Sequence, residues 1–231
     1  MKPFGAEARS VSMKSRITFA QVPPPVAQTV SPFARILRHP FFAWAGLRFP
    51  IAQHTLAEHE ALMRYSCGAR CAVEIGVAEG ASAAGLREAM SPDGALYLVD
   101  PFHLSRVRVL NFLKRAAQRA VHSAGNGRTT WIESFSYDAV REWNLPIDFL
   151  LIDGDHQEQA VERDWQDWSP FVTQDGIVAF HDARLFASGW TSPEYGPVRF
   201  VDRFFRQGSP SPWSIIDEVD SLVFVSRRKS S

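Results

Sequence analysis

Cysteine is scarce in this sequence: its 231 residues include only Cys67 and Cys71. A tetrahedral metal clip needs a second pair of ligands, so this spacing does not indicate a structural zinc site. We expect two reduced, partly buried thiols, with a disulfide as the less favoured alternative. Net charge is also missing, because 25 Lys and Arg residues balance 25 Asp and Glu residues. The charge balance therefore gives no electrostatic reason to expect a nucleic-acid or membrane-surface partner.

Long hydrophobic runs are absent as well. The longest apolar stretch near the start, residues 40–52, is interrupted by Arg48 and is shorter than the roughly 20 residues that a membrane-spanning helix needs. No apolar signal core precedes it, so we expect a cytoplasmic protein without a membrane span. Residues 1–38 carry six Lys or Arg and one Glu. The sequence therefore predicts a basic, flexible extension over 1–39 and a folded domain over 40–231, with 40–69 as an N-terminal cap and lead-in helix.

What the chain does contain is a regular alternation of short apolar runs and segments of helical spacing, which favours a parallel α/β sheet. The predicted strands are 72–75, 96–99, 129–132, 147–152, 176–180, 214–219 and 222–226, and the predicted helices are 55–65, 81–90, 104–122, 137–143, 157–168 and 198–206.

The last two strands decide the topology. Only Asp220 and Ser221 separate them, whereas a parallel crossover needs about a dozen residues or more. The last strand must therefore run antiparallel to its neighbour. The sequence predicts an α/β fold of three layers, with a mostly parallel seven-stranded sheet and an antiparallel C-terminal strand. At the other end, Thr55 and Glu58 form a capping box for the first helix of the domain.

A glycine-rich turn follows the first strand. Glu74 lies in that strand, and Gly76 and Gly80 are separated by three residues before the next helix begins. Glycine lets the backbone adopt positive φ and approach a ligand closely. The third glycine of a dinucleotide-binding turn is missing. The next strand ends in Asp100, where a carboxylate can accept both hydroxyl groups of a ribose.

This arrangement resembles the S-adenosylmethionine site of the class I, seven-stranded methyltransferases, which have a Rossmann-like fold. The resemblance extends from about residue 55 to the C-terminus and implies S-adenosyl-L-methionine as the cofactor. The contacts that it implies are Glu74, Gly76, Gly80, Ser82, Asp100, Ser136 and Asp153. Two of these residues have a second explanation: Glu74 can anchor the glycine turn, and Ser136 can cap the helix that it precedes.

A second group of polar residues follows the strands 147–152 and 176–180. Asp153 and His156 come after the first strand, and His181 and Asp182 come after the second. The carboxyl ends of neighbouring parallel strands meet at one edge of the sheet, so we expect these side chains to lie close together. Carboxylates suit Mg²⁺, and an imidazole nitrogen would shift the preference towards Mn²⁺ or another transition metal.

The Asp-Gly-Asp-His and His-Asp patterns resemble the metal-dependent O-methyltransferases, a group that includes catechol and macrolide-sugar O-methyltransferases. The resemblance implies Mg²⁺ or Mn²⁺ on Asp153, His181 and Asp182, and His156 as the catalytic base. His181 departs from the pattern, because better-known members have Asp or Glu there. Asp155 is better explained as a turn or helix-cap residue.

Three functions remain open from the sequence. The first is methylation of a small-molecule or sugar hydroxyl, with the segment 41–51 and the loop 183–197 shaping the acceptor pocket. The second is a metal-dependent hydrolase built on the same sheet, and the third is a non-catalytic module that binds S-adenosylmethionine. We expect a small-molecule partner and no nucleic acid, and the sequence is compatible with a homo-oligomer.

Overall fold

The computed structural model describes residues 18–19, 40–102, 111–125, 127–187, 189–208 and 211–228. Its main sheet has the strands β3 (Cys71–Ile75), β4 (Ala95–Val99), β5 (Arg128–Ile132), β6 (Ile147–Ile152), β7 (Val172–Phe180), β8 (Trp213–Val219) and β9 (Leu222–Arg227). The helices are α3 (Leu56–Tyr65), α4 (Ala81–Ala89), α5 (Phe112–Ala124), α6 (Ser136–Ala139), α7 (Glu158–Trp168) and α8 (Gly196–Val201). Shorter helical segments are η1 (Val140–Glu142), η2 (Ser169–Phe171) and η3 (Asp202–Arg206).

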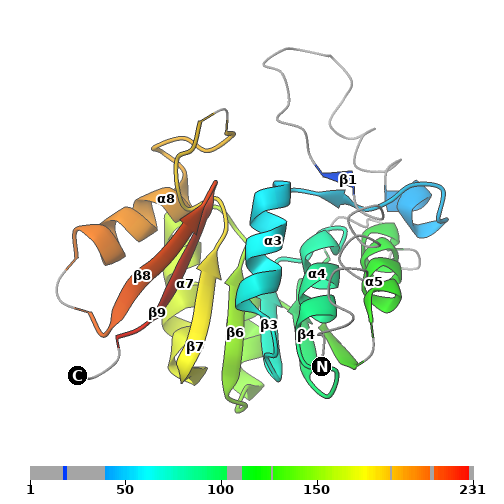
Figure 1. Cartoon of the computed structure of the whole chain (residues 1–231), viewed down its shortest axis with the longest axis horizontal. Helices are drawn as coiled ribbons and strands as arrows, with labels where there is room; N and C mark the ends of the chain where they lie inside the picture. The colour runs from blue at the N-terminus through cyan, green and yellow to red at the C-terminus, as the bar shows by residue number, and fades with distance from the viewer. Residues whose placement is uncertain are drawn as a thin grey trace, which may run out of the picture.

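The seven strands lie in the order β5-β4-β3-β6-β7-β9-β8. Among the described strands of this sheet every pairing is parallel except those of β9 with β7 and with β8. The antiparallel last strand predicted from the two-residue connection is therefore confirmed, and so is the predicted α/β class. Figure 1 shows β9 inserted between β7 and β8. The carboxyl ends of the parallel strands, which lead into the polar loops, lie at the upper edge of the sheet in this view.

Helices cover both faces of the sheet, which gives the predicted three layers (Figure 1). Alternate strand residues point to opposite faces, and Ala72 and Val73 already belong to different cores. One core joins the sheet to α3, α4 and α5 through Leu62, Leu86 and Val121. The other core joins it to α7 and α8 through the aromatic residues Trp165, Trp168 and Phe200. Strands buried on both faces explain why these runs read as continuously apolar in the sequence.

Most predicted elements agree with the structure to within one or two residues. The strand predicted at 176–180 is longer and begins at Val172. The helix predicted at 104–122 is described from Phe112 to Ala124, and residues 103–110 lie outside the described part of the chain. The capping box is confirmed, because the Thr55 side chain accepts from the Glu58 backbone and the Glu58 side chain accepts from the Thr55 backbone. These differences at element ends leave the order of strands unchanged.

The segment before α3 contributes a feature that the sequence did not predict. Ile51 and Ala52 form a short strand, β2, which pairs in parallel with β1, Thr18–Phe19. Of the predicted extension 1–39, only Thr18–Phe19 lies within the described residues. Residues 40–44 are helical, and Phe41 and Trp44 contact the ring of Phe112 at the start of α5. Within the described ranges, no helix has both the length and the apolar character needed to cross a lipid bilayer.

Helix α7 buries an acidic residue, Asp164, which is 5% exposed and accepts a hydrogen bond of 2.5 Å from the Ser136 hydroxyl. Burial raises the pKa of Asp164 to about 6, although the hydrogen bond from Ser136 opposes the shift. Because the folded-state pKa lies above the unfolded value of 3.8, the folded protein binds this proton more tightly. The stability that the proton contributes is present below about pH 4 and is lost as the pH rises through about 6.

We predict that Asp164→Asn removes this pH dependence, because an amide stays neutral and its oxygen can still accept from Ser136. The free energy of unfolding of the variant minus that of the wild type should rise by up to about 3 kcal/mol between about pH 4 and pH 7.5. Urea denaturation at both pH values measures the difference. Asp175→Asn, at an exposed position of β7, is the control for an Asp-to-Asn change that leaves Asp164 and its partners unaltered. A difference for Asp164→Asn that does not change with pH would contradict the raised pKa.

Candidate functional site

The glycine turn between β3 and α4 has the geometry that its two glycines permit. Gly76 has φ +86° and Gly80 has φ +78°, and both values favour glycine. A Cβ atom at Gly76 would lie 2.0 Å from the backbone oxygen of Asp153, and one at Gly80 would lie 2.8 Å from Cα of Ala117. Ala78, between them, also has a positive φ, of 46°. The turn is therefore pressed against the loop after β6 on one side and against α5 on the other.

Glu74 lies beneath this turn and is completely buried. The hydroxyl of Ser82, in the first turn of α4, donates a 2.5 Å hydrogen bond to its Oε1. Its other oxygen, Oε2, is buried without a hydrogen-bond partner in the described structure. Burial raises the pKa of Glu74 well above its ordinary value, and the nearby carboxylates of Asp153 and Asp100 add to the shift. A buried acceptor without a donor is costly unless a ligand supplies the donor.

Asp100 follows β4 and holds the two loops beside it. Its Oδ2 accepts from the backbone nitrogen of Val77 at 2.9 Å, and its Oδ1 accepts from that of Phe102 at 2.6 Å. The sequence predicted a ribose contact for Asp100 and missed this anchoring role. Each carboxylate oxygen can accept more than one hydrogen bond, so capacity for ribose hydroxyls remains.

Glu79 lies in the glycine turn and is nearly buried. It is 9% exposed, and its Oε2 accepts from the backbone nitrogen of Ile51 in β2 at 2.9 Å. The two residues are 28 positions apart, so no local pattern in the sequence could have linked them. This bond fastens the segment before α3 onto the glycine turn.

The polar residues after β6 and β7 meet as the sequence predicted. Because the two strands pair in parallel with Ile152 opposite Phe180, the residues that follow them start at the same edge. Nδ1 of His181 lies 3.1 Å from Oδ1 of Asp153 and 3.4 Å from Oδ1 of Asp182. Nε2 of His156 lies 3.1 Å from Oδ2 of Asp182.

Burial differs sharply within this cluster. The side chain of His181 is 4% exposed, whereas that of His156 is 46% exposed. Burial alone would lower the pKa of His181, but the carboxylates of Asp153, Glu58 and Asp182 together raise it well above its ordinary value. For His156 the hydrogen bond to Asp182 outweighs burial and raises the pKa. His156 is thus the histidine of the cluster that solvent or a bound molecule can reach.

Asp182 is held in an unusual backbone conformation. Its φ is +53°, a region that is costly for residues other than glycine and less so for Asp. Nε1 of Trp190 donates a 2.5 Å hydrogen bond to Oδ1 of Asp182, and the ring of Tyr195 lies 5.6 Å from that of His156. The loop that follows β7 therefore returns over the cluster with two aromatic side chains. The sequence predicted this loop near an acceptor but did not identify Trp190 or Tyr195.

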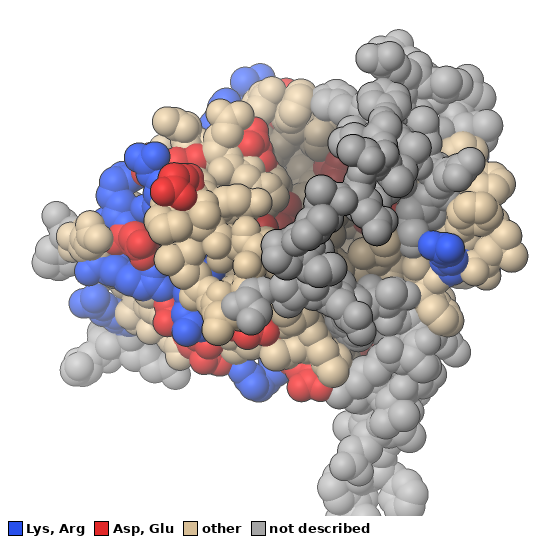
Figure 2. Space-filling view, turned by 90° about the horizontal axis from the view of Figure 1, so that it is seen from above, with Lys and Arg blue, Asp and Glu red and all other residues tan. Residues whose placement is uncertain are grey.

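The loop after β7 ends where Gly196 packs closely against the loop after β6. A Cβ atom at Gly196, the first residue of α8, would lie 2.3 Å from the backbone oxygen of His156. The start of α8 therefore packs directly on the loop after β6. Figure 2 looks down on this edge and shows acidic side chains near the middle of the face, while Lys and Arg gather towards the end that carries α8. Arg199 and Arg203 there form ion pairs with Glu158.

The three predicted metal ligands come together, but their arrangement does not fit an ion. Within the described ranges, no group of three or more His, Cys, Asp or Glu side chains is arranged to hold a metal. His181 instead lies between Asp153 and Asp182 as an ion-paired side chain. A metal on Asp153, His181 and Asp182 therefore stays a prediction from the sequence.

Two other predicted residues have structural partners. Ser136 begins α6, and Phe135 rather than Ser136 is its N-cap; the Ser136 hydroxyl donates to Asp164. Oδ1 of Asp155 accepts from the backbone nitrogen of Gln157 at 3.0 Å, which agrees with its interpretation as a turn residue. Neither contact tests whether Ser136 binds a cofactor.

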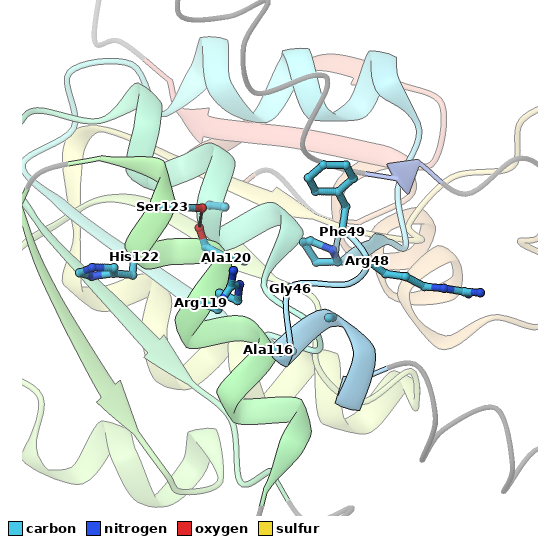
Figure 3. A pocket seen from close by; sticks show the side chains of 11 residues that line it. Gly46, Arg48, Phe49, Ala116, Arg119, Ala120, His122 and Ser123 are labelled. Carbon is cyan, nitrogen blue, oxygen red and sulfur yellow. Dashed lines mark hydrogen bonds between the residues drawn. The ribbon is translucent and has the colours of Figure 1, made fainter.

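A cavity of about 380 Å³ lies elsewhere, between residues 43–50 and the outer sides of α4 and α5 (Figure 3). Arg48, Phe49, Arg119 and His122 line it. None of its lining residues is a predicted catalytic, cofactor or metal residue, although its residues between 43 and 50 belong to the segment 41–51 that the sequence predicted to shape the acceptor pocket. The cavity is therefore separate from the polar edge of the sheet.

Comparison with known proteins agrees with this geometry. A family model described as a methyltransferase domain matches residues 73–183, the stretch from β3 to just beyond β7. It includes the glycine turn and the residues Asp153, His156, His181 and Asp182, but not Glu58. Both groups of residues thus belong to one recognised domain.

Solved structures show the same fold at low identity. A protein from Corynebacterium glutamicum is 15% identical, with 97% of this chain and 98% of that chain covered and a TM-score of 0.61. The O-methyltransferase from Bacillus cereus, in complex with SAH, is 17% identical, with 88% and 94% covered and a TM-score of 0.54.

The O-methyltransferase TomG from Streptomyces achromogenes, involved in tomaymycin synthesis and in complex with SAM, is 14% identical, with 96% of each chain covered and a TM-score of 0.53. These identities are too low to show more than the fold, whereas the family model also identifies the kind of domain. The chain therefore carries a methyltransferase domain of the class I, S-adenosylmethionine-dependent kind.

Proposed function

We propose that the protein transfers the methyl group of S-adenosylmethionine to a hydroxyl group of a small molecule, with His156 as the base that removes the hydroxyl proton. The observation that carries this proposal is the pair of His156 and Asp182, 3.1 Å apart, with a half-exposed imidazole at the same edge as the glycine turn. An imidazole that is oriented by a buried carboxylate is a common catalytic base.

The residues present fit the cofactor. Gly76 and Gly80 let the turn adopt positive φ and pack against the backbone of Asp153 and of Ala117, and Glu74 beneath it has a buried oxygen that lacks a donor in the described structure. We propose that this oxygen meets the amino group of the cofactor and that Asp100 meets its ribose. The bound cofactor supplies a methyl group that is already activated by its sulfonium. The protein must then orient an acceptor oxygen in line with that group and take its proton.

The contact between His156 and Asp182 decides which nitrogen of His156 can accept the proton. Nε2 of His156 faces Asp182, so Nδ1 is free to accept a proton from the acceptor. Asp182 is suited to hold the ring, because its own side chain is 8% exposed and hydrogen bonds from His156 and Trp190 lower its pKa against the opposing effect of burial. Trp190 and Tyr195 would form an aromatic wall for a ring-shaped acceptor.

No step of this mechanism passes through a metal, because the donor set does not fit one. The choice of a small molecule over a nucleic acid is also a proposal, supported by the zero net charge of the chain. That the protein forms a homo-oligomer is likewise a proposal. A non-catalytic cofactor-binding module is the alternative that the pair of His156 and Asp182 argues against.

The first prediction concerns the cofactor. S-adenosylmethionine at about a hundred times its dissociation constant should stabilise the wild type by about 2.7 kcal/mol. Asp100→Ala should lose most of this gain, because it removes the ribose acceptor and releases Val77. Thermal denaturation and calorimetric titration measure both effects. Asp93→Ala, an exposed residue in the turn before β4, is the control. Unchanged affinity in Asp100→Ala would remove Asp100 from the binding site.

The second prediction concerns the base. His156→Ala should lower kcat by roughly 10²–10⁴-fold and leave cofactor affinity nearly unchanged, because only the proton acceptor is lost. A screen of phenolic and sugar hydroxyl acceptors, followed by release of S-adenosylhomocysteine, provides the assay. The wild-type rate should increase as the pH rises through a pKa above the ordinary histidine value, since Asp182 favours the protonated form.

The variant should lack this rise. His122→Ala, an exposed histidine beside the separate cavity, should keep wild-type kinetics. A near-wild-type rate for His156→Ala at neutral pH would mean that another group, or water, accepts the proton.

The third prediction decides between the metal site expected from the sequence and the ion-paired cluster. Because His181 fills the position between the carboxylates, initial rates should change by no more than about twofold in excess chelator. Loss of turnover that Mg²⁺ or Mn²⁺ restores would instead establish a catalytic metal at Asp153, His181 and Asp182.

A further inference from the structure

Glu58 is buried more deeply than a helix cap requires. Its side chain is fully inaccessible to solvent. Oε1 accepts from both the backbone nitrogen and the hydroxyl of Ser221, at 2.7 and 2.6 Å. Oε2 accepts from the backbone nitrogen of Thr55 at 2.7 Å and lies 3.7 Å from Nε2 of His181. One carboxylate therefore links the start of α3, the turn between β8 and β9, and the candidate site.

His181 has carboxylates on both sides of its ring. Nδ1 faces Asp153 and Asp182 at 3.1 and 3.4 Å, and Nε2 faces Glu58 at ion-pair distance. The ring of His54 packs at right angles to that of His181, with centroids 6.5 Å apart. Rotation of the imidazole by half a turn about its Cβ–Cγ bond would place carbon atoms, instead of Nδ1 and Nε2, opposite these carboxylates. Without Glu58, only the side facing Asp153 and Asp182 would still favour the present orientation.

We propose that Glu58 is a positioning residue, which holds the ring of His181 so that Nδ1 faces Asp153 and Asp182 and thereby keeps Asp182 in place for His156. The proposal rests on the proposed function, because the placement of Asp182 matters for turnover only if His156 is the base. Glu58 touches neither cofactor nor acceptor in this scheme and acts through His181. The carboxylate is supplied 123 residues before the histidine, by a helix that the domain match at 73–183 does not include.

Other roles of Glu58 can be separated by their contacts. Thr55→Ala removes the N-cap oxygen and leaves the carboxylate in place, and Ser221→Ala removes one donor to Oε1. Both changes weaken the scaffold around Glu58 without touching His181. The N-cap change should lower the melting temperature, because the first turn of α3 loses its capping acceptor.

The test measures kcat and cofactor affinity separately for Glu58→Gln with an acceptor that the wild type methylates. We expect kcat to fall at least about tenfold, with the dissociation constant of S-adenosylmethionine within about threefold of the wild-type value. The two control variants should keep kcat within about threefold even where their melting temperatures fall. An unchanged kcat in folded Glu58→Gln, or an equal loss in both controls, would overturn the proposal.

A double-mutant cycle tests whether Glu58 acts through His181. Glu58→Gln combined with His181→Asn should be no slower than His181→Asn alone, because the histidine that Glu58 positions is already gone. Losses that multiply would show an independent effect of Glu58 and overturn the proposal. If Glu58→Gln does not fold, Glu58→Asp replaces it. The shorter side chain keeps the charge but withdraws it from His181, and full kcat in that variant would overturn the proposal.

Imidazole ¹⁵N shifts provide a readout that does not depend on turnover. The His181 signals, assigned by their loss in His181→Asn, should change in Glu58→Gln and stay unchanged in Ser221→Ala. Unchanged His181 signals in Glu58→Gln would overturn the proposal even if activity falls. If the wild type methylates no acceptor, the proposed function fails on that result, and the shifts still decide whether Glu58 positions His181.

Discussion

The close approach of Gly76 to the backbone of Asp153 is the constraint on which both halves of the site depend. β3 and β6 pair in parallel with Ile75 opposite Ile152, and the backbone nitrogen of Asp153 donates to the oxygen of Ile75 at 2.9 Å. Any side chain at position 76 would overlap the Asp153 carbonyl. The glycine turn and the loop after β6 are therefore packed backbone against backbone, which places the proposed cofactor contacts and the proposed base on adjoining strands.

Two buried glutamates near this unit show how local donors decide charge. Burial disfavours the ionised form of both Glu58 and Glu74. For Glu58, His181 and the donors from Ser221 and Thr55 outweigh burial, and its pKa is lowered. Glu74 has one donor, Ser82, and its pKa is raised. Both oxygens of Glu58 thus have donors within the protein, whereas Oε2 of Glu74 has none in the described structure.

The sequence predicted what depends on local pattern and sheet topology. Strands buried on both faces gave uninterrupted apolar runs, the short Asp220-Ser221 connection required an antiparallel strand, and the carboxyl ends of β6 and β7 brought Asp153 and His181 together. Contacts between distant segments gave no such signal. Glu58 accepts a hydrogen bond from Ser221, 163 residues away. Its place in the capping box already accounted for a Glu at position 58, so nothing in the sequence indicated a second role. The hydrogen bond from Trp190 to Asp182 depends on the path of a loop, which composition does not specify.

Backbone strain gathers at the same edge as these contacts. Ala78, Phe102, Asp182 and Asp220 are the non-glycine residues with positive φ in the described structure, and each lies just beyond the carboxyl end of a strand, namely β3, β4, β7 and β8. An L-residue in this region costs roughly 1–2 kcal/mol. Specific contacts hold three of the four: Asp100 binds the backbone of Phe102, Trp190 binds Asp182, and Thr55 binds Asp220. Among the described residues, the opposite edge uses only glycines at positive φ, so the strained non-glycine residues gather at the edge that carries the polar cluster, which is better explained by the demands of a site than by those of folding.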